Sequence, residues 1–182
     1  MKKDLLIPPI IADCIYYAVS GVSDVQFLET SGCPACSGPL ISHDLKKRRF
    51  STIKTDAGVA HVYVYIKRFH CRDCGLLCYA DAPFYENSRF GSPIIDLCLV
   101  LSRSHSFSYT SHILDQLGIV IDRGTVRKIA QRYDHPVKVV DLYGIQIPSS
   151  ILALSTLGMK SAQSGPLSGS DVLQACGFPE PL

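Results

Sequence analysis

Apolar residues near the amino end of the chain recur with the period of an α-helix. They fall at positions 7, 11, 14, 15, 18 and 19. Pro8 and Pro9 stand at the start of this stripe and Gly21 follows it, and such residues are typical start and stop signals for a helix. The pattern therefore predicts a packing helix within residues 1–24, with Cys14 on its apolar face and not available as a ligand.

The next segment has the two-residue alternation that is typical of β-strands. Residues 59–68 direct alternate side chains to two faces, and Asp56-Ala57-Gly58 supplies turn residues just before them. This arrangement predicts a β-hairpin whose first strand follows the basic run 46–49. Further short strands are expected at residues 25–29 and 76–80.

Two pairs of cysteines flank the expected hairpin, in Cys33-Pro34-Ala35-Cys36 and Cys71-Arg72-Asp73-Cys74. Each pair offers two thiolates from one tight turn, and four thiolates make the closed tetrahedral shell of a structural Zn²⁺ site. Gly38 and Gly75 follow the pairs, where a metal-binding knuckle needs a residue that tolerates positive φ. The pattern predicts a zinc ribbon with Cys33, Cys36, Cys71 and Cys74 as metal ligands.

Other interpretations of these cysteines are weaker. Disulfide bonds require an oxidising compartment, and no secretory signal is recognisable in the sequence. A thioredoxin-like redox pair has the spacing of Cys33 and Cys36 but requires a surrounding βαβ pattern. His43 or His70 could replace one cysteine in a Cys₃His site. Cys78 lies on a strand that leaves a complete four-sulfur site, so we expect it to pack in the interior.

Residues 88–136 have the pattern of three successive helices. Ser92 and Pro93 begin the first helix, and Ser108 caps the second, which ends at Gly118. Asp122 caps the third. The helices are expected at residues 92–101, 109–117 and 123–133. Three helices in this order predict a helix-turn-helix unit.

The third of these helices has the composition of a DNA-recognition helix. Its apolar residues recur at core spacing, and basic residues occupy much of the remaining face. The apolar set is Val126, Ile129, Ala130 and Tyr133, and the basic set is Arg123, Arg127, Lys128 and Arg132. Such a helix can enter the major groove of DNA, although an ordinary surface helix with solvated basic side chains is the alternative.

Beyond residue 136 the hydrophobic pattern weakens. This stretch is rich in Ser, Gly and Pro, and only short helices are expected in it, near residues 149–154 and 171–175. The predicted fold class is therefore α+β, with a small β zinc ribbon followed by a three-helix bundle. The predicted parts are an N-terminal helix at 1–24, the ribbon at 25–87, the helix-turn-helix at 88–136 and a poorly structured tail at 137–182.

The distribution of charge is uneven, although the formal net charge of the 182 residues is only +2. Residues 43–90 carry nine Lys and Arg against five Asp and Glu, and residues 122–136 carry four against two. A basic middle part is typical of a polyanion-binding face, although most charge clusters are solvated surface. No apolar run approaches the roughly 20 residues of a membrane span, so we expect a soluble cytoplasmic protein without a membrane partner.

The combination of these motifs resembles the amino-terminal region of insertion-sequence transposases of the DDE type. The resemblance rests on both cysteine pairs, on Phe69-His70 before the second pair, on Ser88-Arg89-Phe90-Gly91, and on Leu117-Gly118-Ile119 with Thr125-Val126. In that family a zinc ribbon and a helix-turn-helix recognise terminal inverted repeats of DNA, and a separate RNase H-like domain carries the catalytic carboxylates. The resemblance covers about residues 30–135, and its motifs are short.

Two departures from that family affect the expected activity. The turn from Gly118 to Thr125 is about two residues longer than the tight form of the motif. Beyond residue 136 the only carboxylates are Asp141, Asp171 and Glu180, too few to build a separate catalytic domain. The resemblance therefore implies DNA recognition without strand transfer. We expect a protein that is not an enzyme and has no small-molecule substrate.

The leading hypothesis is a zinc-stabilised, sequence-specific DNA-binding protein, either a remnant or a regulatory relative of a transposase. Its expected partners are double-stranded DNA and, in addition, a second copy of the chain or an intact transposase. The alternative is a protein-interaction module that docks a transposase or another polypeptide. An enzyme with an open zinc site is disfavoured, because four thiolates leave no coordination position free. The expected DNA contacts are Lys46, Lys47, Arg48, Arg49, Lys67, Arg68, Arg72, Arg123, Thr125, Arg127, Lys128 and Arg132.

Overall fold

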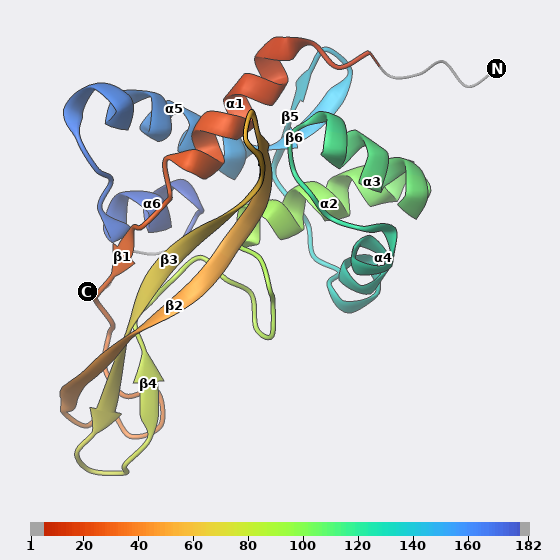
Figure 1. Ribbon diagram of the computed structural model, residues 1–182. Coiled ribbons are helices and arrows are strands. Elements are labelled where there is room, and N and C mark those ends of the chain that lie inside the picture. The colour runs from red at the N-terminus through yellow and green to blue at the C-terminus, as the bar shows by residue number, and fades with distance from the viewer. Residues whose placement is uncertain (1–5, 179–182) are drawn as a thin grey trace.

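A long antiparallel hairpin connects the two ends of the molecule (Figure 1). In the computed structural model, which describes residues 6–178, β2 (Leu40–Thr55) pairs with β3 (Gly58–Cys71) along almost their whole lengths. β1 (Gln26–Phe27) adds to β3 in parallel, and β4 (Leu77–Tyr79) adds to it in antiparallel orientation. The hairpin prediction is confirmed, but its first strand begins at Leu40, so the basic run 46–49 lies within the strand and not before it. Glu180, one of the carboxylates considered above, lies outside the described residues.

The hairpin has a buried half and an exposed half. Near its turn, Phe50, Val62 and Val64 are buried in the main hydrophobic core. Toward the cysteine pairs the hairpin projects away from the helices, as Figure 1 shows, and Ile41 and Leu45 are exposed. The half of the hairpin near its turn therefore belongs to the main hydrophobic core. The half near the cysteine pairs lies outside that core.

Three helices follow the ribbon, as the sequence predicts: α2 (Ser92–Ser104), α3 (Phe107–Gln116) and α4 (Arg123–Arg132). The Asp122 side chain caps α4 by accepting a hydrogen bond from the Thr125 amide. Two other expected caps are wrong. Gly91 is the N-cap of α2 in place of Ser92, and Ser106 caps α3 in place of Ser108, because α3 begins two residues earlier than expected.

The turn between α3 and α4 is hydrogen-bonded to the hairpin. The Lys54 amide donates to the Gly118 carbonyl oxygen, and the Val120 amide donates to the Thr52 carbonyl oxygen, both at 2.9 Å. Lys54 also forms an ion pair with Asp115 at 2.6 Å. The turn thus forms an isolated antiparallel bridge to β2, at Ile119 and Ile53. These contacts fix the position of α4 relative to the hairpin.

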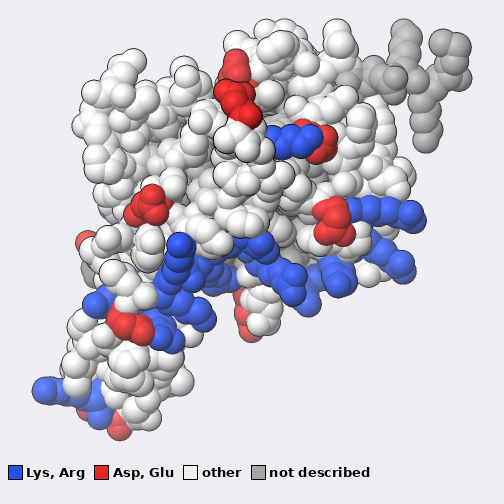
Figure 2. Space-filling model, viewed as in Figure 1, with Lys and Arg blue, Asp and Glu red and all other residues white. Residues whose placement is uncertain are grey.

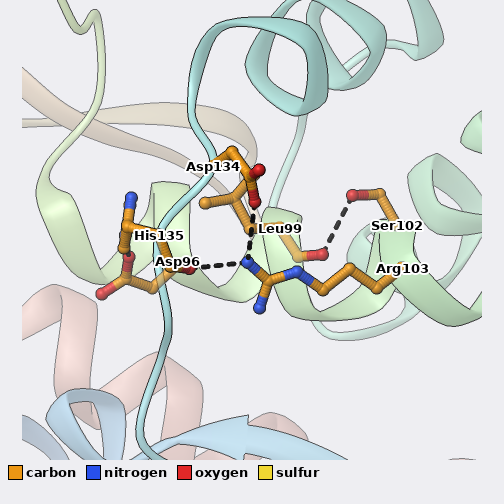
Figure 3. A network of polar contacts seen from close by, with 6 residues as sticks. All are labelled: Asp96, Leu99, Ser102, Arg103, Asp134 and His135. Atoms are coloured by element: carbon orange, nitrogen blue, oxygen red, sulfur yellow. Dashed lines mark hydrogen bonds and ion pairs between the residues drawn. The ribbon is translucent and has the colours of Figure 1, made fainter.

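The segment that follows α4 is attached to α2 by a polar network (Figure 3). His135 Nε2 lies 2.8 Å from Asp96 Oδ1, and Arg103 donates to the His135 carbonyl oxygen at 2.6 Å and faces Asp134. Outside the view of Figure 3, the Tyr85 hydroxyl donates to the same Asp96 oxygen. These contacts fix the position at which the chain leaves α4.

The prediction of a poorly structured tail is wrong. The carboxyl-terminal part forms β5 (Val139–Leu142), β6 (Ile145–Pro148), α5 (Ser149–Ser164) and α6 (Gly169–Ala175). Ile145, Ile147 and Ile151 are buried in the same core as the hairpin and the first helix, α1 (Pro9–Ser20). The helix expected over residues 149–154 runs ten residues further, because its small residues let it pack closely against α1.

The contact between α1 and α5 leaves no room for side chains at its centre. A Cβ atom built on Gly158 would lie 2.1 Å from the Tyr17 carbonyl oxygen, and one built on Gly21 would lie 2.7 Å from the Gly158 Cα. Gly158 therefore serves close packing of the two helices. Among residues 6–178, no helix combines the length and the apolar character that a bilayer-crossing helix requires.

We expect Gly158→Ala to destabilise the protein by about 1–3 kcal/mol, because the new methyl group forces α1 and α5 apart. In an ordinary helix interior the same change stabilises by about 0.5–1 kcal/mol, so the sign of the effect is diagnostic. Equilibrium chemical unfolding measures it. Thr156→Ala, at an exposed position of the same helix, is the control and should change stability by less than about 0.5 kcal/mol. A stabilising Gly158→Ala would contradict direct backbone contact between the helices.

Candidate metal centre and basic surface

The four cysteines predicted as metal ligands come together at the tip of the hairpin. The Sγ atoms of Cys33, Cys36, Cys71 and Cys74 all lie within 4.8 Å of one another. Cys33 Sγ is 3.6 Å from Cys74 Sγ, and Cys36 Sγ is 3.4 Å from Cys71 Sγ. In a tetrahedral Zn²⁺ site with Zn–S bonds of about 2.3 Å, neighbouring sulfurs lie about 3.8 Å apart. The donor set and its spacing therefore fit a structural Zn²⁺ ion.

Each cysteine pair lies in a tight backbone turn. The Ser37 amide donates to the Cys33 carbonyl oxygen at 2.9 Å, and the Gly75 amide donates to the Cys71 carbonyl oxygen at 3.0 Å. Gly75 has φ of +72°, as predicted. In the first turn the prediction is wrong, because Ser37 takes the positive φ. The space beside Gly38 is tight, since a Cβ atom there would lie 2.5 Å from Asp73 Oδ2 and 3.0 Å from Cys71 Sγ.

The crowding of the four thiols makes their ionisation unequal. Hydrogen bonding from the Ala35 backbone lowers the pKa of the Cys33 thiol to about 6. Hydrogen bonding from the Gly38 backbone likewise lowers the pKa of the Cys36 thiol. The neighbouring Cys71 and Cys74 outweigh this effect and raise that pKa to about 12. A second thiolate beside the first is disfavoured without a cation. A divalent ion removes this repulsion, which is a further reason why the cluster suits a metal.

The surroundings of the cluster agree with a closed structural site. Cys33 and Cys71 are buried, whereas Cys36 and Cys74 are exposed. Cys78 is buried beside them and its thiol is directed to the Leu76 carbonyl oxygen, as expected for a packing residue. The tip has only a small apolar cluster of its own, separate from the main core. A bound ion would therefore supply the order that a hydrophobic core supplies elsewhere.

A basic surface extends from the hairpin to α4. Figure 2 shows Lys and Arg side chains gathered along one border of the molecule, below the helical body and beside the hairpin. On α4, Arg123, Arg127 and Lys128 are exposed and form no ion pair within the described residues. On β2, Lys46 and Lys47 are exposed, and Lys47 lies over the Tyr63 ring at 4.3 Å.

Some of the predicted DNA contacts also have partners within the protein. Arg48 is half-buried, lies over the Phe84 ring at 4.0 Å and donates to the Ser88 carbonyl oxygen at 2.7 Å. Burial lowers the pKa of its guanidinium. Arg68 binds the Asp44 carboxylate through two nitrogens, which lowers the pKa of that carboxyl. The Thr125 hydroxyl donates to the capping Asp122.

The remaining predicted contacts differ in exposure. Arg72 is exposed at the metal tip, whereas Lys67 and Arg49 are half-buried on the hairpin, where Arg49 faces the Phe90 ring. Arg132 is exposed on α4 and donates to the Asn87 carbonyl oxygen at 3.0 Å.

Arg89 is a basic residue that was not among the predicted DNA contacts. It lies in the loop over residues 86–90, at the predicted boundary between the ribbon (25–87) and the helix-turn-helix (88–136). The structure places this loop between the hairpin and α4. In the sequence, only the charge of Arg89 and its position after Ser88 could have indicated a role in DNA binding.

Comparison of the chain with protein-family models, with curated proteins and with solved structures finds no match. The resemblance to transposases therefore stays a prediction. What the structure supports is a mixed α+β fold with a four-cysteine cluster that is consistent with a zinc site.

Replacing Cys36 by Ser should abolish zinc binding, because three thiolates and a hydroxyl no longer complete the shell. We expect elemental analysis to find about one zinc ion per wild-type chain and almost none in the variant. Hydrogen exchange should then accelerate at residues 33–38 and 71–77 but not in α1, α2 or α5, which share the main core. Cys14→Ser, remote from the cluster in sequence and on α1, is the matched control and should retain the metal. Undiminished zinc content in Cys36→Ser would contradict the assignment.

Proposed function

We propose that this chain is a zinc-stabilised protein that binds duplex DNA through the basic surface formed by α4 and the hairpin. The observation that carries the proposal is the direct connection of these two elements. Lys54 and Thr52 of β2 are hydrogen-bonded to the turn that precedes α4. A rigid pair of basic elements can hold phosphates at fixed separations, which loose charged side chains cannot do.

The helix would provide sequence preference. Its amino-terminal half carries Arg123 and Arg127, neither of which forms an ion pair within residues 6–178. α4 begins at a well-formed cap, and it is the last of three helices in the order of a helix-turn-helix. In that motif, residues near the start of the last helix contact base edges in the major groove.

The hairpin would provide affinity and register. Lys46, Lys47, Arg49 and Lys67 are suited to phosphate contacts along its length, and Arg72 is suited to a contact at its tip. From Val64, which pairs with Arg48, the strand β3 runs seven residues to Cys71, or roughly 23 Å. This reach is comparable with two thirds of a DNA helical turn of about 34 Å. The metal would keep the tip in position at that distance.

Arg48 and Arg68 have a different part in the proposal. Both are held by partners within the protein, so they position the hairpin and its neighbouring loop. Thr125 contributes to the cap of α4. The proposal assigns no catalytic step to the chain.

The proposal predicts that binding to duplex DNA weakens steeply with salt, because phosphate contacts release condensed counterions. The double variant Arg123→Ala/Arg127→Ala should reduce affinity by about tenfold or more, as loss of two charged contacts implies. Because the proposal places these two residues at base edges, the variant should also bind duplexes of different sequence with more nearly equal affinity. Titrations of labelled duplexes of different sequence, at several salt concentrations, measure the affinity, its salt dependence and this loss of discrimination.

The matched control is Lys138→Ala/Lys160→Ala, which removes the same charge at exposed positions outside α4 and the hairpin. It should leave the affinity within about twofold, since exposed charges beyond a Debye length are largely screened. Equal losses in the two double variants would show that only net charge attracts DNA. Absence of wild-type binding at low salt would overturn the proposal and favour the protein-interaction alternative.

A further inference from the structure

A cavity of about 330 Å³ lies between the loop over residues 86–90 and α4. It is lined by Asn87, Ser88, Arg89, Phe90, Ile95, Thr125, Lys128, Ile129, Arg132 and Tyr133. Its volume is at the lower end of the range for small-ligand sites. We call it the loop–helix cavity.

The walls of the loop–helix cavity are held by hydrogen bonds from both sides. Arg132 of α4 and Tyr133, the C-cap of that helix, donate to the carbonyl oxygens of Asn87 and Glu86, each at 3.0 Å. From the hairpin, Arg48 donates to the Ser88 carbonyl oxygen at 2.7 Å. The loop therefore needs little rearrangement to receive a ligand, which lowers the entropic cost of binding.

The charge of the lining has one sign. Arg89, Lys128 and Arg132 contribute three cations, and no Asp or Glu is among the described residues that line the cavity. Arg89 and Lys128 form no ion pair within residues 6–178. Arg132 uses one guanidinium nitrogen for the loop and keeps further N–H donors. An anion is thus the ligand class that this lining fits.

The residues at the cavity are separate from the outer basic row of α4. Thr125, Lys128 and Arg132 follow one another at three- and four-residue spacing, so they lie on one side of the helix. Arg123 and Arg127 are four residues apart and lie on another side. α4 therefore presents two basic rows, of which only one borders the cavity.

We propose that the loop–helix cavity binds a phosphate group, with Arg89, Lys128 and Arg132 as its ligands. Two guanidinium groups and an ammonium suit a tetrahedral anion with several acceptor oxygens. The phosphate belongs either to the DNA backbone or to a free phosphorylated compound. Assignment of this phosphate to the DNA backbone depends on the proposed function, whereas the existence of the phosphate site does not.

The first experiment titrates inorganic phosphate into the zinc-loaded chain of 182 residues and follows backbone amide signals by NMR. Saturable shifts confined to residues 86–90 and to the 125–132 row are expected, with none when chloride is added to the same ionic strength. Arg89→Ala should weaken phosphate binding by about tenfold, the effect of losing one charge-assisted contact. Arg123→Ala, on the other side of α4, is the matched control and should leave it unchanged. Shifts that spread over the whole basic surface, or an equal effect of the two variants, would overturn the proposal.

The second experiment distinguishes the two sources of the phosphate by measuring duplex DNA binding of Arg89→Ala beside Lys160→Ala. For a backbone phosphate, Arg89→Ala should lower the DNA affinity and reduce the salt slope by about 1, and the control should do neither. Weakened phosphate binding with unchanged DNA affinity would support the site but assign it to a free phosphorylated compound.

A loss of DNA affinity without a local response to phosphate would make Arg89 a surface contact and overturn the cavity as a site. Failure of the wild-type chain to bind DNA, with phosphate binding intact, would overturn the proposed function alone.

Discussion

Hydrogen bonding between β2 and β3 is the interaction on which the rest of the structure depends. At one end it carries the cysteine turns, and at the other it enters the main core through residues such as Phe50 and Val64. Its edge also pairs with the turn before α4, through Thr52 and Lys54. A single hairpin thus fixes the distance between the candidate metal centre and the basic helix. Without that pairing, the two basic elements would have no defined separation.

Order at the two ends of the hairpin has different physical origins. The body is held by one continuous apolar core that includes α1, α2 and the carboxyl-terminal elements. The tip buries few apolar side chains, and a cluster of four thiols takes the place of a core. The loop over residues 86–90 is held in a third way, by donors from the hairpin and from α4 that meet its carbonyl groups. Arg48 and Arg132 hold this loop, so their structural role cannot be inferred from charge alone.

Much of the local structure follows from the sequence because its signals are local. The alternation before Arg68, the turn at residues 56–58 and the cap at Asp122 each predict an element that is present. The cysteine spacing likewise predicts the cluster, because two tight turns joined by a hairpin have few other ways to be arranged. The carboxyl-terminal part was misjudged for a physical reason. Small residues such as Gly158 weaken a helical pattern, yet Gly158 allows direct backbone contact between α1 and α5.

The sequence by itself determined most of the elements before residue 137, the cluster of four cysteines and the presence of a basic helix, since each depends on neighbours within a few residues or on fixed spacing. Only the tertiary structure decided which basic side chains are free. Arg48 and Arg68 are engaged within the protein, while Arg89 comes to border a cavity beside Lys128. Such outcomes depend on contacts between residues 24 to 40 positions apart, and no local pattern predicts where distant carbonyl groups and carboxylates will lie.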